Sequence, residues 1–395
     1  PMFLLMQTKI DRVNAIIREN LTAIRVVKSF NRQNHEEARF KERNDSLRDT
    51  ALRAISLIVF LMPVLSIVTY STIVAVLWFG GIQVASGLME TGELISFITY
   101  ITQILMSLMM MSFFFMQLLR ATASVTRIVE VLNTESEIKE DENPIRELPD
   151  GSVAFEGVSF RYPGSSEKTL KNINFHINSG EVLGIIGSTG SSKSTLVQLI
   201  PRLYDTTEGR VLVGGIDVKR YDIKALRDKV AFVLQKNTLF SGTIRENMKW
   251  GNEKASDEEI IHALKLAQAW EFVSKYKDGL DHRVDQGGEN FSGGQKQRLT
   301  IARALLKSPK IIILDDSTSA VDMATDAKIQ RIFKDELKDV TTIIIAQRVS
   351  SIQYADRILV MNEGEIEASG KHEDLLLSSP IYREIYESQQ RGVGA

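Results

Sequence analysis

A segment rich in Gly, Ser and Thr has the residue types of a phosphate-binding loop. It consists of Gly187, Ser188, Thr189, Gly190, Ser191, Ser192, Lys193, Ser194 and Thr195. Apolar runs predict a strand over Val182–Ile186 before it and a helix over Thr195–Leu203 after it, the context that such a loop requires. Backbone N–H groups would then bind phosphate, Lys193 would reach the terminal phosphates, and Ser194 would ligate Mg²⁺. Taken alone, the segment could also be a turn without a ligand.

A second element with chemical potential is the apolar run Ile311–Leu314, which ends in two carboxylates, Asp315 and Asp316. The run predicts a buried strand, and a carboxylate at its end suits a Walker B position that holds Mg²⁺ through water. Any buried strand can end in Asp by chance. The pairing of such a strand with an upstream phosphate-binding loop argues for a nucleotide site that holds Mg²⁺.

The most specific motif is Phe291-Ser292-Gly293-Gly294-Gln295. Small residues at a helix start allow its N–H groups and dipole to face an anion. The alternative is a helix start with no ligand. Here the chain resembles the ATP-binding cassette (ABC) transporter family, whose signature is Leu-Ser-Gly-Gly-Gln. Only the first position differs. In that family the signature faces the γ-phosphate of the ATP bound by the opposite subunit.

The resemblance covers residues 150–388 and implies further roles. Tyr162 matches the aromatic that stacks on adenine, and Gln235 matches the glutamine that links the Mg²⁺ site to the membrane domain. Asp322 matches a loop that contacts the partner. Each of these residues alone would fit an ordinary surface or core position. The implied metal ligands are Ser194, Gln235 and Asp315.

Three departures from the family pattern fall in the half-site that this chain supplies to its own nucleotide. Asp316 replaces the Glu that acts as general base, Gln347 replaces the switch histidine, and Ser192 replaces Gly in the phosphate-binding loop. A further departure, Gln286 in place of Glu, lies upstream of the signature. The shorter side chain of Asp withdraws the carboxylate by about 1.5 Å. A general base must lie within about 2.6–3.2 Å of its proton or act through a water. The catalytic candidates are therefore Asp316, Gln347 and Gln235.

The signature motif that this chain supplies to its partner is intact. A homodimer would have two impaired sites. The pattern resembles heterodimeric bacterial multidrug exporters, in which one composite site is degenerate and the other hydrolyses ATP. We therefore expect this chain to be the degenerate-site subunit.

Six apolar runs predict the strands of an α/β domain. They are Ser152–Phe160, Val182–Ile186, Val230–Val233, Ile311–Leu314, Thr342–Ile345 and Arg357–Met361. We expect this P-loop ATPase domain over 150–388, with a helical subdomain at about 238–306 and a tail at 389–395. The acidic, polar stretch at 134–149 predicts a linker before it.

Two long stretches before the linker contain no charged residue, Ala54–Met89 and Leu94–Leu119. Each can hold a membrane-spanning helix, predicted at about 54–80 and 94–119, because a span needs roughly 20 apolar residues. A pair of buried helices in a soluble core is the alternative. Arg53 and Arg120 flank the stretches, whereas their connection has no Lys or Arg, so we expect both outer flanks in the cytoplasm. The predicted location is the cell (inner) membrane.

Apolar residues recur at helical spacing from Leu4 to Arg53, which predicts an amphipathic cytoplasmic helix or helix pair over 1–53. By the resemblance, this part contains a coupling helix, the two spans correspond to the fifth and sixth helices of an exporter half, and four upstream helices are missing. The second span is rich in Met and Phe. These side chains could face lipid and neighbouring helices, or form an adaptable wall for apolar substrates.

The bulk composition excludes several functions. The 395 residues carry 48 basic and 50 acidic side chains and no cysteine. Disulfides and thiolate metal sites are therefore excluded. The chain also lacks the excess of basic residues that is typical of nucleic-acid-binding proteins. We expect an exporter of hydrophobic or amphipathic compounds that pairs with a second half-transporter. A ribosome- or DNA-directed ABC protein, an importer ATPase and a regulatory ABC protein are the alternatives.

Overall fold

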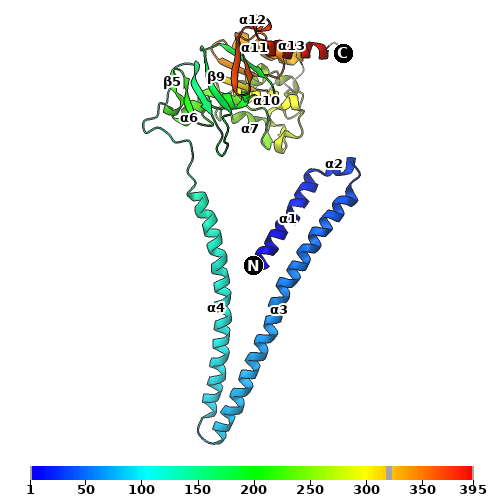
Figure 1. Cartoon of the computed structure of the whole chain (residues 1–395), viewed down its shortest axis with the longest axis vertical. Coiled ribbons are helices and arrows are strands. Elements are labelled where there is room, and N and C mark those ends of the chain that lie inside the picture. The colour runs from blue at the N-terminus through cyan, green and yellow to red at the C-terminus, as the bar shows by residue number, and fades with distance from the viewer. Residues whose placement is uncertain (1, 317–322, 394–395) are drawn as a thin grey trace. The chain divides into compact units, whose positions relative to one another are not determined.

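The computed structural model describes residues 2–316 and 323–393, and it divides into two units, Pro1–Glu135 and Ser136–Ala395. The first unit is helical and the second contains the sheets (Figure 1). The order of a helical unit followed by an α/β unit agrees with the predicted fold class. Residues 136–149, expected as a linker, are part of the second unit. Arg202 donates from Nη2 to the carbonyl oxygen of Lys139 at 2.8 Å, and Ile145 donates its backbone N–H to Arg220 O at 2.8 Å.

The helical unit contains α1 (Met2–Thr22), α2 (Ile24–Ser29), α3 (Gln33–Ala85) and α4 (Thr91–Leu132). The helix expected from Leu4 to Arg53 is thus interrupted. Its last part is continuous with the first predicted span, because α3 extends past Pro63, which lies within that span. Asn31 lies in the left-handed region (φ 52°) between α2 and α3. Asparagine is one of the few residues that adopt this conformation easily, so the chain can turn there without glycine.

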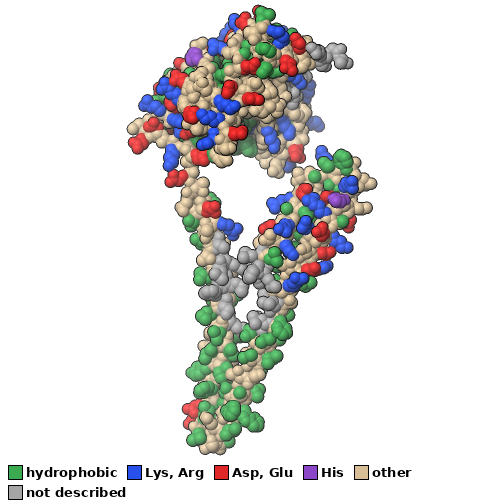
Figure 2. All heavy atoms as spheres, in the orientation of Figure 1, with side chains coloured by type: hydrophobic (Ala, Val, Ile, Leu, Met, Phe, Trp, Pro, Cys, Tyr) green, Lys and Arg blue, Asp and Glu red, His purple; other side chains and the backbone are tan. Residues whose placement is uncertain are grey.

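Two windows are long and apolar enough to cross a membrane, Pro63–Ala85 in α3 and Thr91–Leu108 in α4. None of the first window and 6% of the second is buried within the chain. Hydrophobic side chains gather over the parts of α3 and α4 next to their connecting loop, whereas charged side chains gather over α1 and the first half of α3 (Figure 2). Gly80 lets the two long helices approach, because a Cβ there would lie 2.3 Å from Leu94 Cδ1. The uncovered apolar surface argues against a buried helix pair.

The second unit is built on two main sheets, described here over residues 136–316 and 323–393. A parallel sheet with one antiparallel edge has the order β12-β11-β3-β10-β9-β6, and an antiparallel sheet has the order β2-β1-β4-β5. The strands are β1 (Val153–Phe160), β2 (Leu170–Ile177), β3 (Val182–Gly187), β4 (Glu208–Val213), β5 (Ile216–Asp217), β6 (Val230–Val233), β9 (Ile311–Asp315), β10 (Thr341–Ile345), β11 (Arg357–Asn362) and β12 (Glu365–Gly370). All six predicted strands are present.

The central strands are apolar throughout because both faces of the parallel sheet are buried. Along β9, Ile311 and Ile313 belong to one hydrophobic core, while Ile312 and Leu314 belong to the other. The alternation follows the period of two residues that every strand has. Continuous apolar runs, rather than alternating ones, therefore identified these strands in the sequence.

Helices surround the sheets. A helical region between β6 and β9 contains α7 (Ile244–Lys249), α8 (Asp257–Leu266), α9 (Trp270–Val273), α10 (Gly293–Leu305) and the short pair β7 (Gly242–Thr243) and β8 (Arg283–Val284). The remaining helices are α5 (Lys193–Gln198), α6 (Ile223–Lys229), α11 (Met323–Glu336), α12 (His372–Ser378) and α13 (Pro380–Val393). Helix α5 ends before the predicted Leu203, and Arg202 beyond it has a φ of 51°.

Candidate nucleotide-binding site

The phosphate-binding loop and four further predicted site residues lie at the ends of four neighbouring parallel strands. The phosphate-binding loop follows β3, Gln347 follows β10, and Gln235 follows β6. Asp315 is the last residue of β9, and Asp316 follows it. The carboxyl ends of parallel strands meet at one edge, where open α/β sheets bind their ligands. A cavity of about 330 Å³ lies there, lined by Gly187, Thr189, Gly190, Ser192, Lys193, Ser194, Thr195, Gln235, Asp315, Asp316, Ile345 and Gln347. Residues separated by up to 160 positions in the chain thus share one site.

Lys193 is held inside its own loop. Its Nζ donates to the carbonyl oxygens of Gly187 at 2.9 Å and Ser188 at 2.7 Å, and to Ser191 Oγ at 3.0 Å. Burial lowers the pKa of Lys193, while the charges of Asp315 and Asp316 oppose that shift. A partly buried ammonium in a cavity lined by a glycine-rich turn is the arrangement that binds the terminal phosphates of a nucleotide.

Ser192, which stands where the loop pattern has Gly, adopts a left-handed conformation. Its φ is 70° and its ψ is 21°, and its side chain makes no capping hydrogen bond to α5. This conformation costs an L-residue with a Cβ about 1–2 kcal/mol. The loop therefore keeps the backbone path of the Gly pattern despite the substitution.

Ser194 and Asp315 form a pair suited to Mg²⁺. Ser194 Oγ donates to Asp315 Oδ1 at 2.9 Å, and Asp315 is only 3% exposed. Burial raises the pKa of Asp315, the charge of Asp316 adds to the shift, and the bond from Ser194 and the charge of Lys193 oppose it. Magnesium prefers oxygen ligands, keeps several waters and uses few protein carboxylates. The hydroxyl of Ser194, the carboxylate of Asp315 and the amide oxygen of Gln235 fit such a site.

Asp316 is held by two amides at the same oxygen. Gln347 Nε2 donates to Asp316 Oδ2 at 2.6 Å, and Gln235 Nε2 donates to it at 3.2 Å. The residue is 8% exposed, and its φ of 48° is also left-handed. The three residues assigned to catalysis from the sequence are therefore linked, because both glutamines donate to the carboxylate of Asp316.

The signature motif and Tyr162 lie outside this cavity. Ser292 and Gln295 form a capping box at the N-terminus of α10, with Ser292 N donating to Gln295 Oε1 at 2.9 Å. Neither they nor Gly293 and Gly294 line the cavity. Tyr162 lies beside α5, where its hydroxyl is 3.0 Å from Thr195 Oγ1. Asp322 falls outside the described residues.

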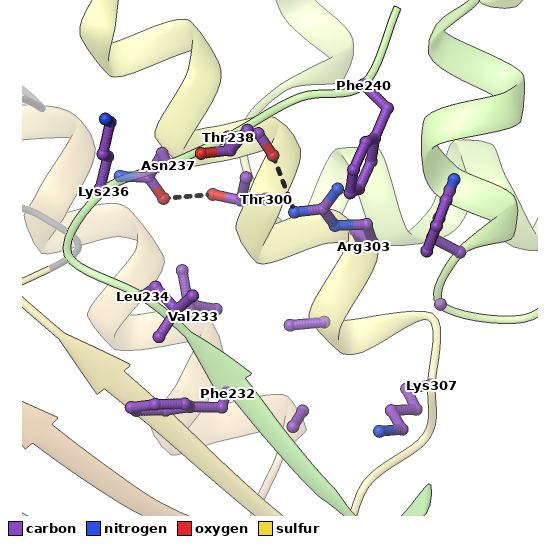
Figure 3. A pocket seen from close by; sticks show the side chains of 14 residues that line it. Phe232, Val233, Leu234, Lys236, Asn237, Thr238, Phe240, Thr300, Arg303 and Lys307 are labelled. Atoms are coloured by element: carbon purple, nitrogen blue, oxygen red, sulfur yellow. Dashed lines mark hydrogen bonds between the residues drawn. The ribbon is translucent and has the colours of Figure 1, made fainter. Parts of the chain in front are cut away.

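Sequence reasoning missed a groove on the other side of the loop that carries Gln235. It has a volume of about 320 Å³ and is lined in part by Leu234, Lys236, Phe240, Trp250, Arg303 and Lys307 (Figure 3). Phe240 and Trp250 stack with ring centroids 4.3 Å apart. The lining contains three cations and no Asp or Glu. Two aromatic residues, Phe240 and Trp250, could have indicated this groove, but they lie ten positions apart in the sequence.

Arg303 lies beside Thr238 and Phe240 in the groove (Figure 3). Its Nη2 donates to Thr238 O at 3.2 Å, and its guanidinium carbon is 5.9 Å from the centroid of the Phe240 ring. Its Nη1 is buried and has no hydrogen-bond partner among the described residues. Burial lowers the pKa of Arg303.

Comparisons with known proteins agree with this architecture. The family model described as ABC transporter transmembrane region matches residues 2–108, and the model described as ABC transporter matches residues 170–319. An uncharacterized ABC transporter ATP-binding protein of Bacillus subtilis, YfiB, is 42% identical over 388 residues, which are 98% of this chain and 67% of that protein. The chain therefore belongs to the ABC transporter family, as a helical transmembrane segment fused to an ABC ATPase domain.

Two further similarities refine the class. A putative multidrug export ATP-binding/permease protein of B. subtilis, YgaD, is 36% identical over 379 residues, covering 96% of this chain and 65% of that protein. The structure of a bacterial Atm1-family ABC exporter with ATP bound superposes with a TM-score of 0.87 at 29% identity, covering 98% of this chain and 69% of that chain. The chain thus has the fold of an ABC exporter half and spans about two thirds of the length of YfiB. Its family implies ATP binding.

Proposed function

We propose that this chain is the degenerate-site subunit of a heterodimeric ABC exporter. The observation that carries the proposal is the environment of Asp316. A general base accepts a proton from the attacking water, and it needs a free lone pair directed at that water. Here the position holds the shorter Asp, and two amide N–H groups donate to the same oxygen, from Gln347 at 2.6 Å and Gln235 at 3.2 Å. This arrangement holds the carboxylate as a hydrogen-bond acceptor and supports slow hydrolysis at this site.

Slow hydrolysis at this site is compatible with binding of Mg·ATP there. Lys193, the backbone of residues 187–195, and the pair Ser194–Asp315 supply the groups that bind phosphates and Mg²⁺. Magnesium would neutralise phosphate charge there. The N-terminus of α10, with Ser292, Gly293 and Gly294, completes the hydrolytic site of the partner, as the family arrangement implies. The tyrosine ring of Tyr162 stacks on adenine, and Asp322 contacts the partner subunit in the same proposal.

The groove lined by Phe240, Trp250 and Arg303 supports a partner that differs from this chain. We assign to it the docking of a coupling helix of the membrane domains. The loop that carries Gln235 separates the groove from the nucleotide cavity, so displacement of a docked helix would reach Gln235 directly. Leu234 and Lys236, the residues on either side, line the groove.

The charge of the groove sets the kind of helix that it accepts. Segment 20–35 of this chain, which contains α2, has Arg25, Lys28 and Arg32 and no Asp or Glu. Docked in the groove of a second copy, it would face Lys236, Arg303 and Lys307. Like charges placed opposite each other disfavour a complex. A partner subunit with an acidic coupling segment would instead satisfy the buried guanidinium of Arg303.

The transported compounds are proposed to be hydrophobic or amphipathic. The described residues of α4 expose Met106, Met110, Met111, Phe113 and Phe114, each by 60–64%. Flexible thioethers and aromatic rings can repack around ligands of different shape. The membrane location proposed is the cell (inner) membrane, with the ATPase domain in the cytoplasm.

The decisive experiment compares two variants of this chain in the assembled transporter in liposomes. Gly294→Asp places a charge at the N-terminus of α10, where the γ-phosphate of the partner's ATP is expected. It should reduce steady-state ATP hydrolysis by about 10²–10³-fold, the usual effect of losing one oriented donor at a transition state. Asp316→Ala should reduce hydrolysis by less than about threefold, because water attack at this site contributes little turnover.

The opposite pattern would reject the proposal. If Asp316→Ala abolishes hydrolysis while Gly294→Asp leaves it near wild type, the competent site is the one built by this chain. Asp316→Asn is the matched control, since it keeps the shape of the side chain and removes the charge.

A further inference from the structure

The loop that carries Gln347 is held by a residue from the C-terminal helix. Gln389 on α13 accepts a hydrogen bond at Oε1 from Val349 N, at 2.9 Å, and donates from Nε2 to Gln347 O at 2.7 Å. One side-chain amide thus pairs with a donor and an acceptor of the same loop. On its other side, Ala346 donates its backbone N–H to Ile185 O of β3 at 3.1 Å. The backbone of Gln347 is therefore fixed between the central sheet and α13.

Helix α13 is itself firmly attached to the ATPase unit. Tyr382 is fully buried, and its hydroxyl lies 2.7 Å from His372 Nδ1 of α12. Arg383 donates from Nε to Leu376 O at 2.7 Å. Ile385 and Tyr386 pack against the core. Because Gln389 follows Tyr382 by two helical turns, it lies on the same face as these anchors.

The contact has a direct consequence for the nucleotide cavity. Gln347 contributes two groups that point in different directions: its carbonyl oxygen accepts from Gln389, while its side-chain amide lines the cavity and donates to Asp316. A long side chain holds its terminal group in place only if its backbone is fixed. The hydrogen bonds that fix this backbone come from Gln389 and Ile185, which lie outside the phosphate-binding loop.

We propose that Gln389 is a positioning residue that sets the preference of this site for ATP over ADP. It keeps the amide of Gln347 next to Asp316, in the cavity that Lys193 and Asp315 also line, where the proposed Mg·ATP would place its third phosphate. Lys193 and the loop 187–195 bind the phosphates that ATP and ADP share. Loss of Gln389 should therefore weaken ATP binding selectively. The inference rests on the proposed binding of Mg·ATP at this site.

The test is photolabelling of this chain by an azido-ATP analogue in the assembled transporter, with competition by Mg·ATP or Mg·ADP. Gln389→Met keeps the helix and the length of the side chain but removes both hydrogen bonds. We expect its half-saturating ATP concentration to rise about threefold to tenfold, as loss of one hydrogen-bonded positioning contact would give. The ADP value should change by less than about twofold, because Lys193, which is proposed to bind the phosphates that ADP shares with ATP, is held by bonds within its own loop. Gln390→Met, at the neighbouring exposed position, is the matched control and should resemble wild type.

A double-variant cycle separates positioning from a structural role. In the Gln347→Ala background, Gln389→Met should cause no further loss of ATP affinity, because the residue acts through Gln347. Gln389→Glu keeps the acceptor for Val349 N–H but cannot donate to Gln347 O, and should behave like Gln389→Met. Equal weakening of ATP and ADP, additive losses in the double variant, or unchanged ATP competition in Gln389→Met would each overturn the inference. Absence of saturable labelling in the wild-type chain would overturn the proposed nucleotide binding and the inference together.

Discussion

Replacement of Ser192 by glycine should stabilise the ATPase unit. Ser192 has a φ of 70° and a ψ of 21°, a conformation that glycine adopts without steric cost. Its side chain makes no capping hydrogen bond to α5, so Ser192→Gly removes no such bond. The backbone path of the loop is already the one that the Gly pattern specifies.

The size of the effect follows from two opposing terms. Relief of the left-handed strain is worth about 1–2 kcal/mol. Glycine also has more conformational freedom in the unfolded chain, which destabilises the folded state by about 0.5–1 kcal/mol. At the midpoints of these two ranges the net stabilisation is about 0.8 kcal/mol, which raises the Tm of a unit of this size by about 2–3 °C. Affinity for Mg·ATP should change little, because backbone N–H groups provide most phosphate contacts.

The assay is thermal unfolding of the purified full-length protein without nucleotide, with Ser192→Ala as the matched control. Alanine removes the hydroxyl but retains the Cβ, so it keeps the strain and should leave the Tm unchanged. A lower Tm for Ser192→Gly, or an equal rise for Ser192→Ala, would refute the argument from backbone strain.

Two further predictions concern the ATPase unit. Lys193→Ala should weaken Mg·ATP binding at this site by about 10–100-fold, because a charge-assisted hydrogen bond to phosphate is lost; an unchanged half-saturation in nucleotide photolabelling would contradict it. Tyr221 donates its hydroxyl to Val213 O at 2.8 Å, and burial raises its pKa from the ordinary value of 10.0 to about 12. The folded state therefore favours the neutral phenol, so this stabilisation is complete below pH 10 and is lost as pH rises from 10 to 12. Urea unfolding midpoints should fall more steeply over that interval for wild type than for Tyr221→Phe, and parallel curves would show that Tyr221 does not contribute.

The sequence alone was sufficient to predict the elements that depend on local pattern. The runs Val230–Val233 and Ile311–Leu314 predict strands because both faces of the sheet are buried, which removes polar residues from them. The phosphate-binding loop and the signature have residue types that few other structures require at that spacing. The uncharged stretches before residue 120 predict the spans because a bilayer tolerates few charges.

The helical boundaries were less accessible to sequence reasoning. The interruption of the run Leu4–Arg53 at α2 carries no Gly or Pro, and only Asn31 marks it. Helix α5 is shorter than Thr195–Leu203, since the chain beyond it leaves the helical conformation at Arg202. Such ends depend on contacts such as that of Arg202 with Asp205, at 2.8 Å, that local propensity does not encode.

The tertiary structure decided which residues meet. The sequence identified Gln235 as a match to the family pattern and Asp316 and Gln347 as departures from it. Their contact at one carboxylate oxygen depends on the strand order β10-β9-β6, which brings together strands that are distant in the sequence. The hold of Gln389 on the Gln347 loop has no sequence signal, because a glutamine near the end of a helix is ordinary. Local periodicity determines secondary structure, whereas the neighbours of a side chain are determined by long-range packing, and the chemistry of this site depends on those neighbours.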